Sequence, residues 1–349
     1  MITITVMTNS MTKDHGASTQ HILQTGMKCC YDENGLEVAC KNSGQDGALC
    51  SGLAWPVPRF SESGSLVKDH LTGLTWSKSG MLSEYPLSWN EAFKLIEQMN
   101  QRREFNRDDW RLPNRRELRS LIDHSAHNPA LPDKHPFEDL YLGWYWTSTS
   151  AALAPAYAWY VHLEGGRMFY GRKTDYYWVW PVCGNSRILP RTGAKYCYDE
   201  NGTIIACSNT KQDGDTRTGV RWPNERFHTG ADRVYDRLTG LTWYNGNMLE
   251  QGPCSWSEAL TMVSRHSEEL GEEWRLPTIN ELESLVDAST HTPALPQNHP
   301  FNMEAVGYWS STSSGYDAAW SYVLYLNKGA VGVGFKRNRD FFLCPVLAA

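Results

Sequence analysis

Apolar residues recur at helical spacing in two stretches of the chain, and each stretch starts with a serine that precedes a glutamate by three positions. The pairs are Ser88 with Glu91 and Ser255 with Glu258. The apolar positions that follow fall on one helical face: Trp89, Ala92, Phe93 and Ile96, then Trp256, Ala259, Leu260 and Val263. A serine and a glutamate at this spacing cap each other's free backbone N–H groups. The pattern predicts two amphipathic helices that begin at these serines.

Two further helix starts lie in a motif that occurs twice, as DDWRLPNRREL (108–118) and EEWRLPTINEL (272–282). Each copy has a capping residue with a glutamate three positions later: Asn114 with Glu117, and Thr278 with Glu281. We interpret both glutamates as helix caps and not as catalytic acids, because a carboxylate beside backbone N–H groups stays ionised. Arg111 and Arg275 are interpreted as partners of a carboxylate or of carbonyl oxygens, with anion binding as the alternative.

Alternation of apolar and polar residues near the end of each half predicts antiparallel strands. In AWYVHLEGGRMFYG (158–171), Trp159, Val161 and Leu163 occupy alternate positions before a Gly-Gly turn. YVLYLNKGAVGVGFKRN (322–338) shows a similar alternation around an Asn-Lys-Gly turn. One face of these strands is expected to pack on the helices, and the other is expected to meet solvent.

Most of the chain consists of two copies of one unit, because the same motifs return in the same order. The copies share CYDENG with a later cysteine (30–40 and 197–207), LTGLTW (71–76 and 238–243), PALP with HPF (129–137 and 293–301), and YW(T/S)STS (145–150 and 308–313). We predict two domains, at residues 26–185 and 193–349. The polar residues 1–25 are expected to form a disordered leader.

Composition narrows the function classes. The 349 residues carry a formal net charge of -6, which favours neither nucleic-acid binding nor an acidic tail. No run of about 18 apolar residues occurs, so we expect no membrane span. Fifteen Trp and seventeen Tyr are enough to fill two cores and also to form a recognition surface.

The ordered motifs resemble the Lcl C-terminal domain family, which is named for the C-terminal domain of a Legionella collagen-like adhesin and was formerly a domain of unknown function. The resemblance covers nearly all of both copies. It implies an exported binding or adhesion module with a C-type-lectin-like fold; the adhesin itself is trimeric and binds sulfated glycans. The expected fold is therefore α+β: two tandem C-type-lectin-like domains, each with two short helices and a twisted antiparallel sheet.

Cysteine spacing indicates the compartment. Of nine cysteines, Cys30 with Cys40 and Cys197 with Cys207 recur at the same spacing around an Asn-Gly hairpin turn, which brings the two ends of each hairpin into disulfide range. We predict two hairpin disulfides, with reduced thiols as the alternative, and hence an extracellular or cell-surface protein, although no signal peptide is visible at the start. The pairing of five cysteines stays open: Cys29, Cys50, Cys183, Cys254 and Cys344.

One set of residues in each copy has the chemistry of a metal site. Aspartate and histidine ligate zinc, and the two sets are Asp123, His127 and His135, then Asp287, His291 and His299. They lie in a Pro-rich loop and lack a recognised zinc spacing, and lectin-type calcium motifs are absent from the sequence. We therefore predict no metal and no cofactor.

Ligand binding is assigned to the last strands of each copy, where the two copies differ most. The residues in question are rich in Tyr, Arg and Lys, which are frequent in binding surfaces. They are Tyr157, Tyr160, His162, Arg167, Phe169, Tyr170, Arg172, Lys173, Tyr176 and Tyr177 in the first copy, and Tyr322, Tyr325, Lys328, Lys336, Arg337, Asn338 and Arg339 in the second. Drift of loops and strand ends is the alternative.

The predicted function is non-catalytic recognition of a glycan or protein at the cell surface. No nucleophile motif is present, and a homo-oligomer is left open. One alternative is an enzyme of the formylglycine-generating type, which has a lectin-like fold and needs a reactive cysteine pair; Cys183 and Cys344 are the candidates. The other alternative is a structural subunit of a surface assembly.

Overall fold

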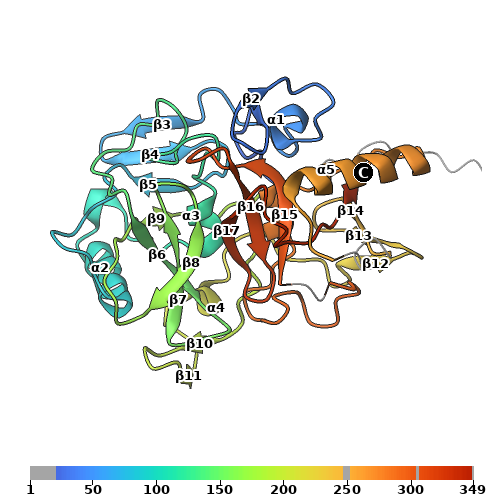
Figure 1. The fold of residues 1–349 in the computed structure, drawn as a ribbon. Helices are drawn as coiled ribbons and strands as arrows, with labels where there is room; N and C mark the ends of the chain where they lie inside the picture. Colours follow the sequence, from blue (N-terminus) through green and yellow to red (C-terminus); the bar gives the residue numbers. More distant parts are fainter. Residues whose placement is uncertain (1–20, 247–251, 304–305, 348–349) are drawn as a thin grey trace, which may run out of the picture.

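A six-stranded antiparallel sheet lies at the centre of the computed structural model, which describes residues 21–246, 252–303 and 306–347 (Figure 1). Each repeat contributes three strands, in the order β15-β16-β17-β8-β7-β6. Their bounds are β6 (Trp144–Ser150), β7 (Tyr157–His162), β8 (Met168–Arg172), β15 (Gly307–Ser313), β16 (Trp320–Tyr325) and β17 (Ala330–Phe335). The repeats meet where β8 pairs with β17, at Met168 and Val331. The sheet is therefore continuous across the two repeats.

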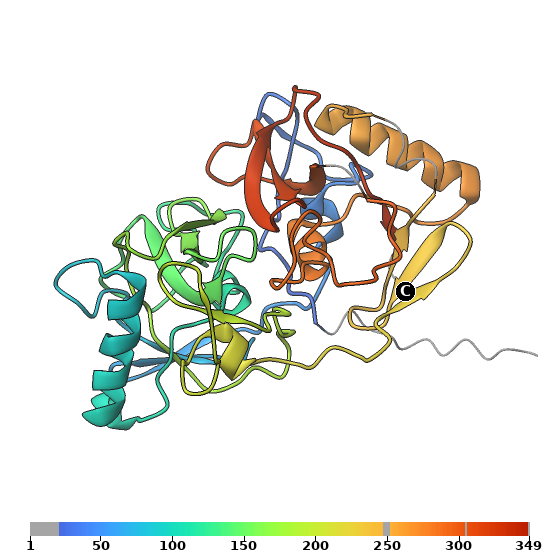
Figure 2. The same ribbon diagram turned by 90° about the horizontal axis from the view of Figure 1, so that it is seen from below.

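Helices cover both faces of this sheet. The short helices α3 (Arg115–Arg119) and α6 (Ile279–Ser284) pack on the face that carries Trp159 and Val161. The longer helices α2 (Trp89–Gln101) and α5 (Trp256–Leu270) pack on the other face, towards its two ends (Figure 2). All four helices begin with a complete capping box, so the predicted starts are confirmed.

A smaller four-stranded sheet completes each repeat, with orders β3-β4-β5-β9 and β12-β13-β14-β18. The strands of the first are β3 (Phe60–Ser63), β4 (Leu66–Asp69), β5 (Thr75–Ser77) and β9 (Val182–Cys183). The strands of the second are β12 (Phe227–Thr229), β13 (Arg233–Asp236), β14 (Leu241–Tyr244) and β18 (Val346–Leu347). The last strand of each repeat pairs with an early strand, which closes the repeat on itself. A 3-10 turn, η1 (Glu104–Asn106), follows α2.

The N-terminal hairpin of each repeat lies on the other repeat (Figure 1). The first consists of β1 (Cys30–Tyr31) and β2 (Glu37–Val38), followed by α1 (Asp46–Leu49). The second consists of β10 (Cys197–Tyr198) and β11 (Ile204–Ile205), followed by α4 (Asp213–Thr216). Thr312 of β15 donates a hydrogen bond of 2.7 Å to Asp46, and Thr149 of β6 donates one of 2.7 Å to Asp213. The two repeats are thus linked by reciprocal exchange of their hairpins.

A glycine at the tip of each exchanged hairpin allows the close approach. Gly35 has a φ of 81°, and a Cβ there would lie 2.7 Å from the backbone nitrogen of Ala319 in the second repeat. Gly202 has a φ of 84°, and a Cβ there would lie 2.7 Å from the backbone nitrogen of Ala156 in the first repeat. Only glycine combines this backbone angle with such a contact. The Asn-Gly turn signal therefore serves hairpin formation and docking together.

Several expectations need adjustment. Residues 1–20 of the expected leader lie outside the described residues, but Ile22 and Leu23 are buried, and Leu23 pairs with Leu53. The expectation of disorder up to residue 25 is therefore wrong for this part, because these side chains fill the junction between the repeats. The α+β class is confirmed, although α2 and α5, at 13 and 15 residues, are longer than expected. No helix in the described part of the chain is long and apolar enough to cross a membrane.

Candidate ligand-binding groove

The residues assigned to ligand binding do not form one surface. Exposed members are Arg172, Tyr176, Arg337, Asn338 and Arg339. Half-buried members are Tyr157, Tyr160, Arg167, Phe169, Tyr170, Tyr177, Tyr325 and Lys328. Buried members are His162, Lys173, Tyr322 and Lys336. Strand alternation also separates neighbours, since Phe169 faces the side of α2 and α5 while Tyr170 packs against Trp159 on the side of α3.

The two buried lysines anchor the exchanged hairpins. Lys336 Nζ donates hydrogen bonds to the carbonyl oxygens of Tyr31 (3.4 Å) and Asp32 (3.2 Å), and lies 4.0 Å from the ring centre of Trp256. Lys173 makes the same contacts in the other repeat: to the carbonyls of Tyr198 and Asp199, over Trp89. Burial lowers the pKa of both amines to about 7. Their nitrogens are occupied within the chain, so we leave both lysines out of the candidate site.

The aromatic residues of the other face contact one another. Tyr160 lies 4.1 Å from Trp144 between ring centres and 4.8 Å from Tyr177. The amine of Lys328 lies 5.5 Å from the ring centre of Phe169, over the middle of the sheet. These rings extend the cores beneath α2 and α5 across the sheet. Tyr322 is buried on the opposite face, where its hydroxyl donates to the carbonyl oxygen of Gly165.

A groove of about 450 Å³ opens where the two repeats meet at the α3 side of the sheet. The first repeat supplies the β7–β8 turn, with Glu164 and Arg167. The second repeat supplies Tyr316 and Asp317 of the β15–β16 loop and Trp320, the first residue of β16. The volume falls within the range of small-molecule sites, and the lining combines aromatic rings with a few charged groups. Arg167 is the residue that this groove shares with the sequence-based assignment.

Local contacts fix the walls of the groove. The side chain of Tyr316 is 54% exposed and packs against the turn at Gly165, and its ring lies 6.0 Å from that of His127. Asp317 accepts a hydrogen bond of 3.0 Å from the backbone nitrogen of Ala319, which leaves its second oxygen for a ligand. Trp320 is half-buried against Phe335, with 5.4 Å between ring centres. The groove therefore presents an exposed ring, a supported indole and both signs of charge.

The equivalent position in the other half is filled. Tyr157 and Tyr170 of the first repeat correspond to Trp320 and Val333 of the second. The two tyrosines are in edge-to-face contact at 5.8 Å, and the guanidinium of Arg172 lies 5.4 Å from the ring centre of Tyr157. Tyr170 is larger than Val333, its equivalent, so the first repeat fills the space that the second repeat keeps open.

The repeated arginine and glutamate form a buried structural pair. Arg111 donates two hydrogen bonds to Glu117, of 2.6 and 2.7 Å, and Arg275 makes the equivalent pair with Glu281. Glu117 also accepts from the backbone nitrogen of Asn114 at 2.9 Å. The interpretation of these residues as caps with a guanidinium partner is confirmed.

The aspartates and histidines of the metal hypothesis have other contacts. Asp123 accepts hydrogen bonds from the backbone nitrogen and hydroxyl of Ser125, at 2.9 and 2.6 Å. Asp287 does the same with Ser289. The rings of His135 and His299 lie 5.9 and 6.1 Å from those of Phe137 and Phe301, between ring centres. Among the residues that the structure describes, no three His, Cys, Asp or Glu side chains gather as a metal site would require.

The cysteines divide into two disulfides and five thiols. Cys30–Cys40 and Cys197–Cys207 are bonded, which confirms the prediction. Cys183 and Cys344 are not equivalent residues of the two repeats, as the enzyme alternative would suggest. The repeated arginines pair with Val182 in the first repeat and with Val346 in the second, so these two valines are equivalent. Counting back two positions, Cys344 corresponds to Trp180 and not to Cys183. Burial raises the pKa of both thiols to about 12, opposite to an activated cysteine. The remaining free thiols are Cys29, Cys50 and Cys254.

Comparison with known families identifies the family to which both repeats belong. The family model described as the Lcl C-terminal domain matches residues 65–183 and 232–346. The chain belongs to the Lcl C-terminal domain family. Both matches begin after the hairpin of their repeat, so the exchanged hairpins lie outside the matched ranges. Membership of this family indicates a surface or adhesin-like protein. No curated protein and no solved structure matches the chain.

Sequence reasoning missed most of the groove. The loop that forms it reads SGYDAAW (314–320) in the second repeat and AALAPAY (151–157) in the first. This difference is visible in the sequence: the second repeat gains Tyr316 and Asp317 and has Trp320 where the first has Tyr157. The sequence-based assignment instead names residues in and around the last strands of each repeat. Lys173 and Lys336, by contrast, recur at equivalent positions, which was a signal of a scaffold role.

Proposed function

We propose that this Lcl-family protein is a non-catalytic recognition module at the cell surface, which binds a glycan in the groove between its repeats. The observation that carries the proposal is the groove's lining: Trp320 and Tyr316 beside Asp317, Glu164 and Arg167. Aromatic rings pack against the C–H faces of sugar rings, while carboxylates and a guanidinium bond their hydroxyls. Two hairpin disulfides support a place in an oxidising compartment.

A C-type-lectin-like origin of each repeat is part of the proposal. It is supported by the closure of each repeat, in which β9 returns to β5 and β18 returns to β14. It is also supported by the irregular loops at the groove, since binding residues concentrate on loops held by a rigid scaffold. Because Tyr170 fills the equivalent space in the first repeat, we propose one glycan site per chain and not two.

A glycan array tests the proposal. Trp320→Ala and Tyr316→Ala each remove a ring from the groove, and we expect a loss of affinity of about tenfold or more, as for an aromatic residue central to a binding site. Tyr85→Ala is the matched control, because Tyr85 is similarly exposed (67%) but lies in the loop before α2. The control should bind every glycan as the wild type does.

A second comparison separates the groove from the exposed basic turn. Arg337→Ala changes the turn after β17, where Arg337 is exposed and lies 4.0 Å from Glu33. If Arg337→Ala abolishes binding while both groove variants retain it, the ligand lies on the turn and the assignment to the groove is wrong. Retention by all of the variants would contradict both assignments.

A further inference from the structure

Helices α3 and α6 face each other across the junction of the repeats but carry different residues at equivalent positions. Arg115, Arg116 and Arg119 on α3 correspond to Ile279, Asn280 and Glu283 on α6. All three arginines are buried. Glu283 lies 3.5 Å from Arg115 and 3.3 Å from Arg116. Arg115 and Arg116 therefore share one carboxylate, while Arg119 forms no ion pair with it.

Two of these arginines have further partners. Arg116 donates hydrogen bonds to carbonyl oxygens at the end of α6, at Glu283, Ser284 and Val286, with lengths of 3.2, 3.1 and 2.9 Å. Arg115 donates to the carbonyl oxygen of Gly329, and its guanidinium carbon lies 3.9 Å from the ring centre of Trp159. Carbonyl dipoles and a ring face both favour a positive charge.

Arg119 has no such compensation. It donates to the side-chain oxygen of Asn280 at 2.9 Å and lies 3.0 Å from Nε2 of His124. Nδ1 of His124 lies 3.1 Å from the carbonyl oxygen of Thr25, so Nδ1 carries the hydrogen and Nε2 accepts from Arg119. Burial lowers the pKa of His124 well below its ordinary value, which keeps this ring neutral.

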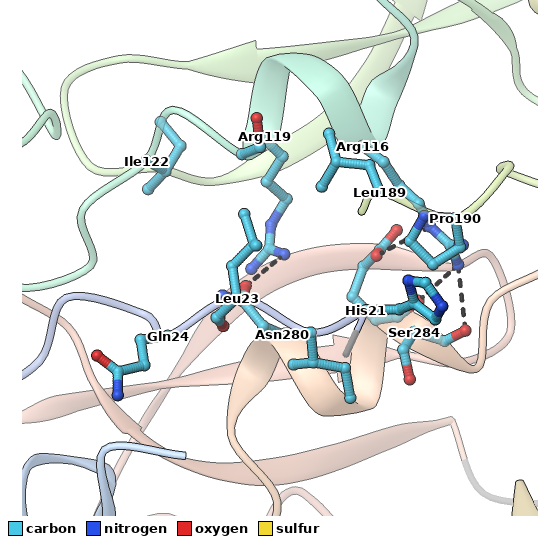
Figure 3. Close-up of a pocket in the computed structure, with 13 residues that line it drawn as sticks. His21, Leu23, Gln24, Arg116, Arg119, Ile122, Leu189, Pro190, Asn280 and Ser284 are labelled. Carbon is cyan, nitrogen blue, oxygen red and sulfur yellow. Dashed lines mark hydrogen bonds and ion pairs between the residues drawn. The ribbon is translucent and has the colours of Figure 1, made fainter. Parts of the chain in front are cut away.

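In the described part of the chain, no carboxylate lies within ion-pair distance of the Arg119 guanidinium, and the nearby carboxylate of Glu283 is already paired with Arg115 and Arg116. The Nε of Arg119 is buried and has no hydrogen-bond partner there. An unpaired buried charge is strongly unfavourable. A cavity of about 50 Å³ adjoins Arg119 (Figure 3). Its lining also includes Arg116, Asn280, Glu283, Leu23 and Ile122.

We propose that this cavity binds chloride, held mainly by Arg119. The space is large enough for one small ion, and Leu23 and Ile122 form an apolar wall on one side of it. A monovalent anion lowers the excess of positive charge between α3 and α6, and thereby stabilises the contact of the two repeats.

Thermal unfolding in sodium chloride and in sodium gluconate at the same ionic strength tests the proposal on the full chain. We expect the Tm to be about 3 °C higher in chloride than in gluconate, because a ligand that binds only the folded state raises the Tm. Arg119→Gln should abolish the difference, whereas Glu283→Gln, which removes the shared carboxylate, should enlarge it. Arg237→Gln removes an exposed positive charge and should keep the wild-type difference.

Crystals soaked in sodium bromide give an independent reading on the wild type. An anomalous peak beside Arg119 is expected, because bromide replaces chloride at such sites. The proposal is overturned if the cavity shows no peak, or if chloride and gluconate give the same Tm. A peak that appears together with an equal chloride dependence in Arg119→Gln would assign the stabilising ion elsewhere and would also contradict the proposal.

Discussion

The carboxyl group of Asp46 connects the two repeats, but one of its oxygens is buried without a hydrogen bond, which lowers stability. It accepts hydrogen bonds from Thr25 of its own repeat (2.6 Å) and Thr312 of the other (2.7 Å), while its second oxygen is buried without a partner in the described residues. Burial raises the pKa of this carboxyl to about 6. Burial also raises the pKa of Asp213, which holds the equivalent position.

Replacement of Asp46 by asparagine should change how stability depends on pH. Between about pH 4 and 6, folded Asp46 holds a proton that the unfolded chain has released, so the free energy of unfolding falls as the pH rises through this window. Asp46→Asn stays neutral, keeps an acceptor for both threonines, and lacks this fall, which amounts to about 3 kcal/mol at most. Urea unfolding of both proteins at pH 4, 5, 6 and 7 measures the difference.

The control for this pH series is Asp108→Asn, because Asp108 is exposed on the loop before the first Trp-Arg-Leu-Pro motif. Because this side chain faces solvent, the substitution should change the free energy of unfolding by less than about 0.5 kcal/mol. A constant difference for Asp46→Asn over the same range would show that Asp46 titrates normally in the folded protein.

At the scale of elements, the docking of each exchanged hairpin is stabilised by one buried lysine. Lys336→Met should leave the carbonyl oxygens of Tyr31 and Asp32 without their donor and destabilise the protein by about 2–3 kcal/mol. The loss should be local, so hydrogen exchange should accelerate in residues 30–40 more than in residues 197–207. Peptide-level exchange measured by mass spectrometry checks this expectation.

The matched control is Lys173→Met, which removes the same contacts from the other hairpin. It should give the reverse pattern, with faster exchange in residues 197–207. If both variants accelerate exchange in both hairpins equally, the lysines stabilise the whole molecule and not their own hairpin.

Elements set by nearby residues were predictable from the sequence, whereas their placement was not. The helix starts follow from capping residues only three positions apart, and the disulfides follow from a hairpin turn between the two cysteines. The exchange of hairpins depends on contacts such as Asp46 with Thr312, which are 266 positions apart. Local pattern carries no information on which repeat receives a hairpin. The groove escaped prediction for the same reason, since two loops from different repeats form it.

At the scale of the whole molecule, the repeats resemble each other in framework and differ where they meet. The arginines of α3 face a glutamate and carbonyl oxygens of α6, so two copies of α3 in the same arrangement would bring arginines together. This asymmetry favours pairing of the first repeat with the second. The same divergence leaves one groove open at Val333 and fills the other with Tyr170.

A continuous sheet and exchanged hairpins should make both repeats unfold together. Leu118 is fully buried beside the sheet in the first repeat, and Leu118→Ala should lower the free energy of unfolding by about 2–5 kcal/mol. In a single cooperative unit, the slowest-exchanging amides of β13 in the second repeat lose as much protection as those of β4 in the first. Leu282→Ala is the equivalent change in the second repeat. It should reduce the protection of the β4 amides in the first repeat as much as that of the β13 amides in the second. Two separate calorimetric transitions, or loss of protection confined to the mutated repeat, would show that the repeats are independent domains despite their shared sheet.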